Sequence, residues 1–141
     1  MKVGYVQFKP LFGEKKNIKT ILELLKEGAN MEADLLVLPE LCNTGYVFKS
    51  TEEVKDLSET VPEGHTTRIL TRFAEDANLY IVVGLCERKD NGVFNSAVLV
   101  GPEGCIAVYR KAHLFNEEKR WFSPGDGPFD VYEIASARIG M

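Results

Sequence analysis

One acidic residue at the end of a buried strand is the first group in this sequence that could do chemistry. Glu40 follows the apolar run Leu35 to Leu38 and then Pro39. Such a run is typical of a strand covered on both faces, and Pro39 favours its end because proline has no backbone N–H. In open α/β sheets, ligands bind in the crevice beyond the carboxyl ends of the strands. A carboxylate in that place lies half out of water, so Glu40 is a candidate general base.

Glu40 also has an ordinary interpretation, as a solvated loop residue or as an acid at a helix N-terminus. The turn that follows, Asn43 to Tyr46, favours the functional interpretation. Gly45 permits a backbone geometry that other residues resist, and Tyr46 places a ring near the carboxylate.

A basic residue stands in the corresponding place after a later strand. Lys111 follows the strand-like segment 105–109, and Glu117 and Glu118 come soon after it. A lysine ammonium that faces a carboxylate in a partly dry pocket can hold an oxyanion in a transition state. On spacing alone, the alternatives are a surface basic pair of Lys111 with Arg110 and a solvated acidic pair of Glu117 with Glu118.

The cysteines and histidines offer less. Cys42, Cys86 and Cys105 are odd in number and irregular in spacing, which predicts neither disulfides nor zinc and fits a reducing cytoplasm. We expect Cys42 to be structural and Cys86 to lie in the core of an apolar strand. His65 and His113 could suggest a Cys–His pair. We expect instead that His113 is a structural hydrogen-bonding residue of the lysine loop and that His65 lies in a loop.

The first elements that must position these groups form a βαβ unit. Lys2 to Phe8 reads as a strand, and Glu14 to about Met31 has apolar residues at the 3.6-residue period of a helix. With the strand that begins at Leu35, these segments predict parallel pairing and a right-handed crossover.

The later elements predict antiparallel pairing. Segments 80–86 and 94–100 read as strands, and the turn 101–104 returns the chain as the hairpin strand 105–109. The sequence therefore predicts an α/β fold whose mixed β-sheet is layered with helices.

Helices and a long loop connect these strands. A short acidic helix is expected near 51–57, and Thr66 or Thr67 can cap a second helix. Residues 110–125 read as a long loop whose aromatic rings need burial, which argues against disorder. Two more strands are expected, at 129–134 and from residue 137 onward.

Composition excludes several classes of protein. The chain has 141 residues, of which 45% are apolar, so we expect a single domain with a core. The net charge is −4 and no basic block stands out, which argues against nucleic acid. No apolar run approaches the roughly 20 residues of a membrane helix. Because the chain opens on a strand-like segment, we also expect no signal peptide and a cytoplasmic protein.

Five short segments carry a resemblance to a known family. They are Leu38-Pro39-Glu40-Leu41, Thr44-Gly45-Tyr46, Asn95-Ser96-Ala97, Tyr109-Arg110-Lys111-Ala112-His113-Leu114-Phe115 and Phe122-Ser123-Pro124-Gly125. In this order they resemble the carbon–nitrogen hydrolase (nitrilase/amidase) superfamily along the whole chain. The resemblance implies an α-β-β-α sandwich assembled from paired subunits, hence a homo-oligomer. It also implies a Glu-Lys-Cys catalytic set with no metal or organic cofactor.

The resemblance assigns roles to individual residues. Glu40 matches the general base, Lys111 the catalytic lysine, Glu118 the supporting glutamate, and Tyr46 a wall of the substrate pocket. The implied reaction begins when a cysteine thiol loses its proton to Glu40 and attacks the carbon of an amide or nitrile. Lys111 stabilises the charge that develops, ammonia or an amine leaves, and water hydrolyses the thioester.

The chain departs from the family pattern at its end. The family's nucleophilic cysteine lies a few residues into the strand that begins at 137–141, beyond the last residue of the sequence. We therefore expect the N-terminal half of a hydrolase domain, inactive and poorly soluble alone. The alternatives are a non-catalytic ligand-binding or assembly module of the same fold, and an unrelated mixed-sheet domain. Which amide or nitrile is cleaved is not predicted.

Overall fold

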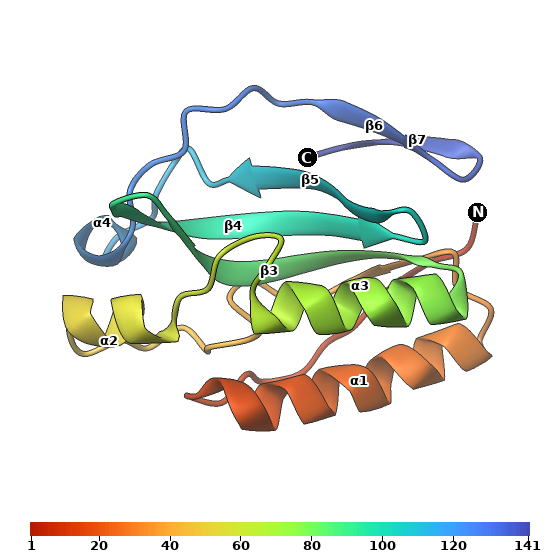
Figure 1. Ribbon diagram of the computed structural model, residues 1–141, viewed down its shortest axis with the longest axis horizontal. Coiled ribbons are helices and arrows are strands. Elements are labelled where there is room, and N and C mark those ends of the chain that lie inside the picture. The colour runs from red at the N-terminus through yellow and green to blue at the C-terminus, as the bar shows by residue number, and fades with distance from the viewer.

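A five-stranded sheet forms the centre of the molecule (Figure 1). The computed structural model describes residues 1–141, apart from the side chains of Glu14 and Lys15. The strands follow the order β1-β2-β3-β4-β5, with parallel pairing from β1 to β3 and antiparallel pairing from β3 to β5. The predicted mixed sheet is confirmed. Its strands are β1 (Val3–Tyr5), β2 (Leu35–Val37), β3 (Tyr80–Lys89), β4 (Gly92–Gly101) and β5 (Gly104–Arg110).

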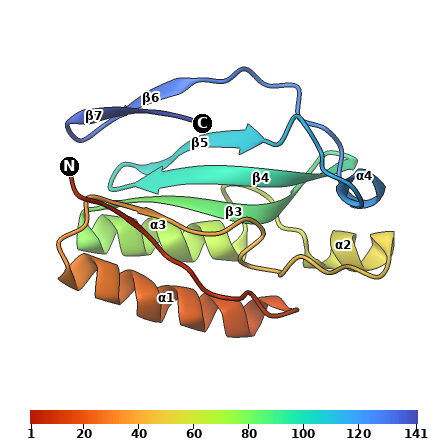
Figure 2. The same cartoon turned by 180° about the vertical axis from the view of Figure 1, so that it is seen from behind.

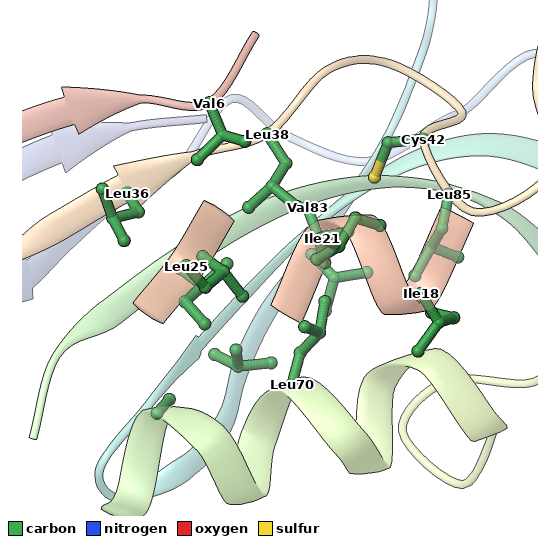
Figure 3. Close-up of a cluster of buried hydrophobic side chains, with 14 of the residues drawn as sticks. Val6, Ile18, Ile21, Leu25, Leu36, Leu38, Cys42, Leu70, Val83 and Leu85 are labelled. Carbon is green, nitrogen blue, oxygen red and sulfur yellow. The ribbon is translucent and has the colours of Figure 1, made fainter. Parts of the chain in front are cut away.

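Two helices cover one face of this sheet, as Figures 1 and 2 show from opposite sides. They are α1 (Glu14–Asn30) and α3 (His65–Ala77). The α1 helix matches its predicted bounds to within one residue, and its apolar stripe is buried at Ile18, Ile21 and Leu25. Figure 3 shows these side chains meeting Leu70 of α3 and the apolar residues of β2 and β3, so the main core lies between helices and sheet.

The first strand is shorter than its sequence predicts. Lys2 to Phe8 was expected to be extended throughout, but only Val3–Tyr5 pairs as a strand. Its neighbour β2 also has three paired residues, so the ladder between them can be no longer. The βαβ arrangement with parallel strands is nevertheless confirmed.

The start of α3 corrects two predictions. The helix begins at His65, which is therefore not a loop residue, and neither Thr66 nor Thr67 caps it. Both threonines lie buried inside the first turn. The Glu59 carboxylate accepts a hydrogen bond from the Thr66 N–H at 2.7 Å, so an acid seven residues earlier serves the helix end in place of a capping side chain at the helix start.

The other helices are short. The helix α2 (Thr51–Leu57) has its predicted bounds, and the Ser50 side chain caps it by accepting from the Glu53 N–H at 3.2 Å. The helix α4 (Glu118–Trp121) is a single turn inside the segment predicted to be loop. A turn of this length is too short to show a helical period. Of the aromatic rings there, Phe122 is buried as expected, whereas Phe115 is 71% exposed.

A hairpin covers part of the opposite face of the sheet. Strands β6 (Val131–Ile134) and β7 (Ala137–Gly140) pair with each other in a separate two-stranded sheet. Ile134 packs with Leu35 of β2 and Leu99 of β4, on the face away from the helices. Neither strand extends the main sheet. Among the described residues, no helix combines the length and apolar character needed to cross a membrane.

A glycine of β3 lets the chain after β2 lie directly on the sheet. A Cβ atom at Gly84 would come within 2.5 Å of the Pro39 carbonyl oxygen and 2.6 Å of the Glu40 Cα atom. The Cys42 N–H donates to the Gly84 carbonyl at 2.9 Å, which ties the two segments together. The position of Glu40 therefore depends on the missing side chain of Gly84.

We predict that Gly84→Ala displaces the segment that carries Glu40. The added methyl group should lower the free energy of unfolding by about 1–3 kcal/mol, the usual cost of overpacking. Urea denaturation of parent and variant measures this. Gly127→Ala is the matched control, because a Cβ atom there meets nothing within 4 Å. Equal stability of the two variants would contradict the prediction.

Candidate active site

The charged groups of Glu40 and Lys111, the two candidates that follow predicted strands, lie in contact. The Lys111 Nζ atom lies 2.7 Å from Glu40 Oε1 and 3.0 Å from Glu118 Oε1. Glu40 follows β2, Lys111 follows β5, and Glu118 opens α4. Glu40 and Lys111 line one open cleft of about 430 Å³. The sequence placed these groups at strand ends, and the fold brings the strand ends together.

The direction of the strands explains this meeting. The strand β5 is antiparallel to β4, which is antiparallel to β3, so β5 runs in the same direction as β3 and its parallel neighbour β2. The carboxyl ends of β2 and β5 therefore reach the same edge of the sheet. Lys111 and Glu40 are long enough to close the gap that β3 and β4 leave between them.

Asn95 of β4 links the two acids of the site. Its Nδ2 atom donates to Glu40 Oε1 at 2.6 Å and to Glu118 Oε1 at 3.1 Å, and its carbonyl accepts from the Lys111 N–H at 2.9 Å. Asn95 belongs to one of the sequence motifs, but no role was predicted for it. Its signal in the sequence is an amide in a mostly apolar strand segment, next to Ser96, since buried polar groups are normally hydrogen-bonded.

Glu118 is the acid around which the cluster is organised. It is 2% exposed, and its Oε1 atom accepts hydrogen bonds from Lys111, Asn95 and the Tyr46 hydroxyl, the last at 2.6 Å. Its Oε2 atom accepts from the Phe115 N–H at 2.6 Å. The neighbouring Glu117 is half exposed and pairs with Arg120 instead. The structure thus separates two adjacent glutamates that spacing alone left equivalent.

These contacts set the charges in the site. Burial alone would raise the pKa of Glu118, but the hydrogen bonds from Tyr46 and Phe115 and the charge of Lys111 outweigh it and hold that pKa below its ordinary value. Burial alone would lower the pKa of Lys111, and its bonds to Glu40 and Glu118 reverse this, so the pKa is raised. Burial and the Glu118 carboxylate raise the pKa of Tyr46. The cluster therefore contains the Lys111 ammonium, the Glu118 carboxylate and the neutral Tyr46 phenol.

Glu40 is the more accessible of the two acids. Its side chain is 44% exposed, and both hydrogen bonds that the described residues give it go to Oε1. The Oε2 atom takes none from them, so it can accept a proton from a group in the cleft. The adjacent Lys111 ammonium can stabilise negative charge that develops there.

Tyr46 lies beside the acids of the site. Its hydroxyl donates to Glu118 Oε1 at 2.6 Å, and the charge of Glu40 contributes to its raised pKa, so its ring is near Glu40 as expected. Tyr46 also lines an apolar pocket of about 230 Å³ next to α4, together with Phe48 and Trp121. Its part in a substrate pocket stays a prediction.

The described cysteines lie apart from this cluster. Cys42 and Cys86 are fully buried, and burial raises the pKa of each thiol to about 12. Figure 3 shows the Cys42 side chain among apolar residues of the main core. Cys105 is partly buried, and burial raises its pKa too. The expected core position of Cys86 is confirmed. His113 is exposed and its side chain has no hydrogen bond to any described residue, which corrects its expected structural role.

We predict that Lys111→Gln destabilises the chain in a pH-dependent way. A carboxylate whose folded pKa is lowered stabilises the fold above its unfolded pKa, and this contribution is lost as pH falls through the folded pKa. Without Lys111 the buried Glu118 loses its cation, at a cost on the order of 2 kcal/mol near pH 7. Urea denaturation from about pH 7 to about pH 3 should show the difference between parent and variant shrinking as Glu118 is protonated.

A control for this experiment is Lys19→Gln, since Lys19 forms only an exposed pair with Glu23. It should change stability little at any pH. If Lys111→Gln lowered the free energy of unfolding by the same amount at both ends of the pH range, the assigned charge of Glu118 would be contradicted.

We also predict that Cys42 and Cys86 resist alkylation in the folded chain. Thiolates are the reactive form, and burial disfavours them at neutral pH. Treatment with iodoacetamide followed by peptide mass spectrometry should find Cys105 labelled first, because it is the least buried of the three. Fast labelling of Cys42 would contradict this prediction and make Cys42 a candidate nucleophile.

Comparison with known proteins identifies relatives along the whole chain. The family model described as carbon–nitrogen hydrolase matches residues 2–141. A nitrilase from Pyrococcus abyssi is 44% identical over 142 residues, covering 100% of this chain and 54% of that protein. A protein N-terminal amidase from Schizosaccharomyces pombe is 34% identical over 139 residues, covering 90% of this chain and 48% of that protein.

A solved structure shares the fold. The crystal structure of an amidase from Nesterenkonia sp. has a TM-score of 0.81 at 23% identity, covering 99% of this chain and 54% of that chain. The predicted α/β class is thereby confirmed. The chain spans about half the length of the curated relatives it matches. The family model and these identities together show that the chain belongs to the carbon–nitrogen hydrolase family.

Proposed function

We propose that these residues form the N-terminal half of a hydrolase that cleaves non-peptide carbon–nitrogen bonds with a cysteine nucleophile. The observation that carries this proposal is the 2.7 Å contact between Lys111 and Glu40 at the edge of an open cleft. It supplies a proton acceptor and a fixed cation beside the same space. The family match and the lengths of the relatives support a nucleophile from the half of the protein beyond residue 141.

In the proposed reaction, Glu40 takes the proton of the cysteine thiol and the sulfur attacks the carbon of an amide or nitrile. Lys111 donates a hydrogen bond to the substrate oxygen or nitrogen on which negative charge develops. With an amide, Glu40 returns the proton to the leaving nitrogen, and ammonia or an amine departs to leave a thioester. With a nitrile, the attack gives a thioimidate, so a water molecule adds to its carbon before ammonia departs and the same thioester forms. Glu40 then takes a proton from water as it attacks the thioester, which frees the acid and the thiol.

Glu118 has a supporting part in this proposal. Its buried carboxylate keeps Lys111 in the ammonium form and fixes the position of Nζ. Asn95 holds Glu40 and Glu118 at a constant separation through one amide group. Pre-organised charge of this kind lowers a barrier because no reorganisation is needed during the reaction.

The substrate is proposed only as a class, an amide or a nitrile. The relatives include a nitrilase and an N-terminal amidase, which act on different groups. On this chain the cleft is lined by apolar residues such as Val37 and Val82, by the ring of Tyr109, and by the polar residues Asn95 and Ser96. Glu40 and Lys111 are the charged residues of this lining. Residues beyond this chain would complete the pocket and choose the substrate.

The same proposal expects the 141-residue chain to be inactive alone. Cys42 and Cys86 are fully buried, and no cysteine among the described residues lines the cleft of Glu40 and Lys111. A homo-oligomeric assembly remains a prediction from the family resemblance. A cytoplasmic location remains a prediction from the cysteine spacing and the strand-like start of the chain. Size-exclusion chromatography of the complete protein tests the first.

We predict that Glu40→Gln lowers turnover of the complete protein by about 100- to 10,000-fold, the span for a lost general base. Ammonia release from a panel of nitriles and amides is the measurement. Glu75→Gln, which changes an exposed carboxylate on α3, should match the parent. Parent-like turnover of Glu40→Gln would remove Glu40 from the mechanism, and ammonia-free binding by the parent would favour the non-catalytic alternative.

A further inference from the structure

We propose that Arg110 is a positioning residue for Lys111. Its buried ion pair with Glu87 fixes the end of β5 from the helix-covered face of the sheet, and so places the Lys111 ammonium on the opposite face. The kinetic part of this inference rests on the proposed function; the geometric part does not.

The ion pair ties three strands together. Arg110 Nη2 of β5 lies 2.5 Å from Glu87 Oε1 of β3, and the Ser96 hydroxyl of β4 donates to Glu87 Oε2 at 2.6 Å. Glu87 is only 1% exposed. A carboxylate that is buried so fully must keep its cation, so the arrangement of these three side chains is strongly constrained.

This cluster lies directly behind the candidate site. Neighbouring residues on a strand point to opposite faces, so Arg110 and Lys111 face away from each other, as do Ser96 and Asn95. Ser96 pairs with Arg110 in the sheet register, and the Lys111 N–H donates to the Asn95 carbonyl at 2.9 Å. Neighbouring residues of β4 and of the end of β5 therefore supply both clusters. Ser96 and Arg110 belong to the cluster on one face of the sheet, and Asn95 and Lys111 belong to the cluster on the other face. Movement of Arg110 must move Lys111.

The end of a strand needs such an anchor. Arg110 is the last residue of β5, and the chain leaves the sheet after it. Strand ends open easily when few side-chain contacts hold them. Besides Glu87, the guanidinium carbon of Arg110 lies 5.3 Å from the centre of the Phe94 ring, and Arg110 Nε has no hydrogen-bond partner among the described residues. The pairing with Glu87 is thus its main directional contact, and a lysine could replace much of it.

The first test measures the pKa of the Lys111 side chain directly. In Arg110→Gln, NMR titration of the Lys111 side chain should show its raised pKa falling toward the ordinary lysine value, because the contacts with Glu40 and Glu118 lengthen. Simple electrostatics predicts the opposite sign, since removing a nearby cation favours the lysine ammonium. Tyr46 and Tyr109 are further titratable groups beside the site. The Tyr46 hydroxyl bonds Glu118, and the Tyr109 hydroxyl accepts from the Ala112 N–H, so neither bonds Lys111. An unchanged or higher pKa in a folded variant would overturn the proposal.

The second test uses kinetics of the complete protein. In Arg110→Gln, kcat should fall by about 10- to 100-fold while KM stays within about threefold, because misplacement by roughly 1 Å affects the reaction more than binding. Arg110→Lys should restore most of kcat. Arg88→Gln removes an exposed arginine next to Glu87 in the sequence, and Leu25→Ala destabilises the core of α1; both should keep the parent's kcat.

Ser96→Ala covers the case in which Arg110→Gln does not fold. It removes one hydrogen bond from Glu87 and leaves the charges intact, so a several-fold loss of kcat and a smaller fall in the Lys111 pKa are expected. The inference would be overturned if Ser96→Ala had the kcat and the Lys111 pKa of the parent and if Arg110→Lys did not restore kcat. If the parent releases no ammonia from any substrate, the proposed function fails, and the Lys111 titration still decides the positioning role.

Discussion

The burial of one carboxylate is the constraint on which the rest of this site depends. Glu118 is almost inaccessible to water, so its charge must be balanced inside the protein. The partners come from different segments: Tyr46 follows β2, Asn95 belongs to β4, and Lys111 follows β5. Each partner must reach the same carboxylate, which fixes the turn after β2, the middle of the sheet and the loop after β5 relative to one another. Glu40, the more exposed acid, occupies the position that this arrangement leaves beside the cleft.

The mixed sheet makes such a site possible. Two antiparallel pairings return β5 to the direction of β2, so residues that follow these strands meet although 71 positions separate Glu40 from Lys111. Gly84 contributes by its missing side chain, which lets the segment after β2 lie against β3. Topology and one close backbone approach, rather than a local motif, bring the acid and the ammonium together.

The same edge of the sheet is polar on both faces. On the side of the helices, Glu87, Arg110 and Ser96 form a compact charged cluster, whereas the remainder of that face is apolar core. On the other side lie Asn95 and Lys111. An ion pair with a buried carboxylate usually stabilises a fold less than apolar side chains of similar volume would, because the charges lose their hydration. Its place behind the site suggests that geometry, more than stability, is what it provides.

The sequence by itself determined the elements with a clear period, such as α1 and the apolar strands, because periodicity is a local property. It also singled out Glu40 and Lys111, since a strand end is visible in the chain. Spacing left Glu117 and Glu118 equivalent and only the family resemblance preferred Glu118, which the tertiary structure places in the site. The tertiary structure alone gave Asn95 its place and showed that Glu59 serves the start of α3 in place of Thr66 or Thr67. These outcomes depend on which side chains meet in space, and the partners range from three to 72 residues apart in the sequence. Whether a polar side chain is buried and paired is settled by what folds against it, and no local pattern records that.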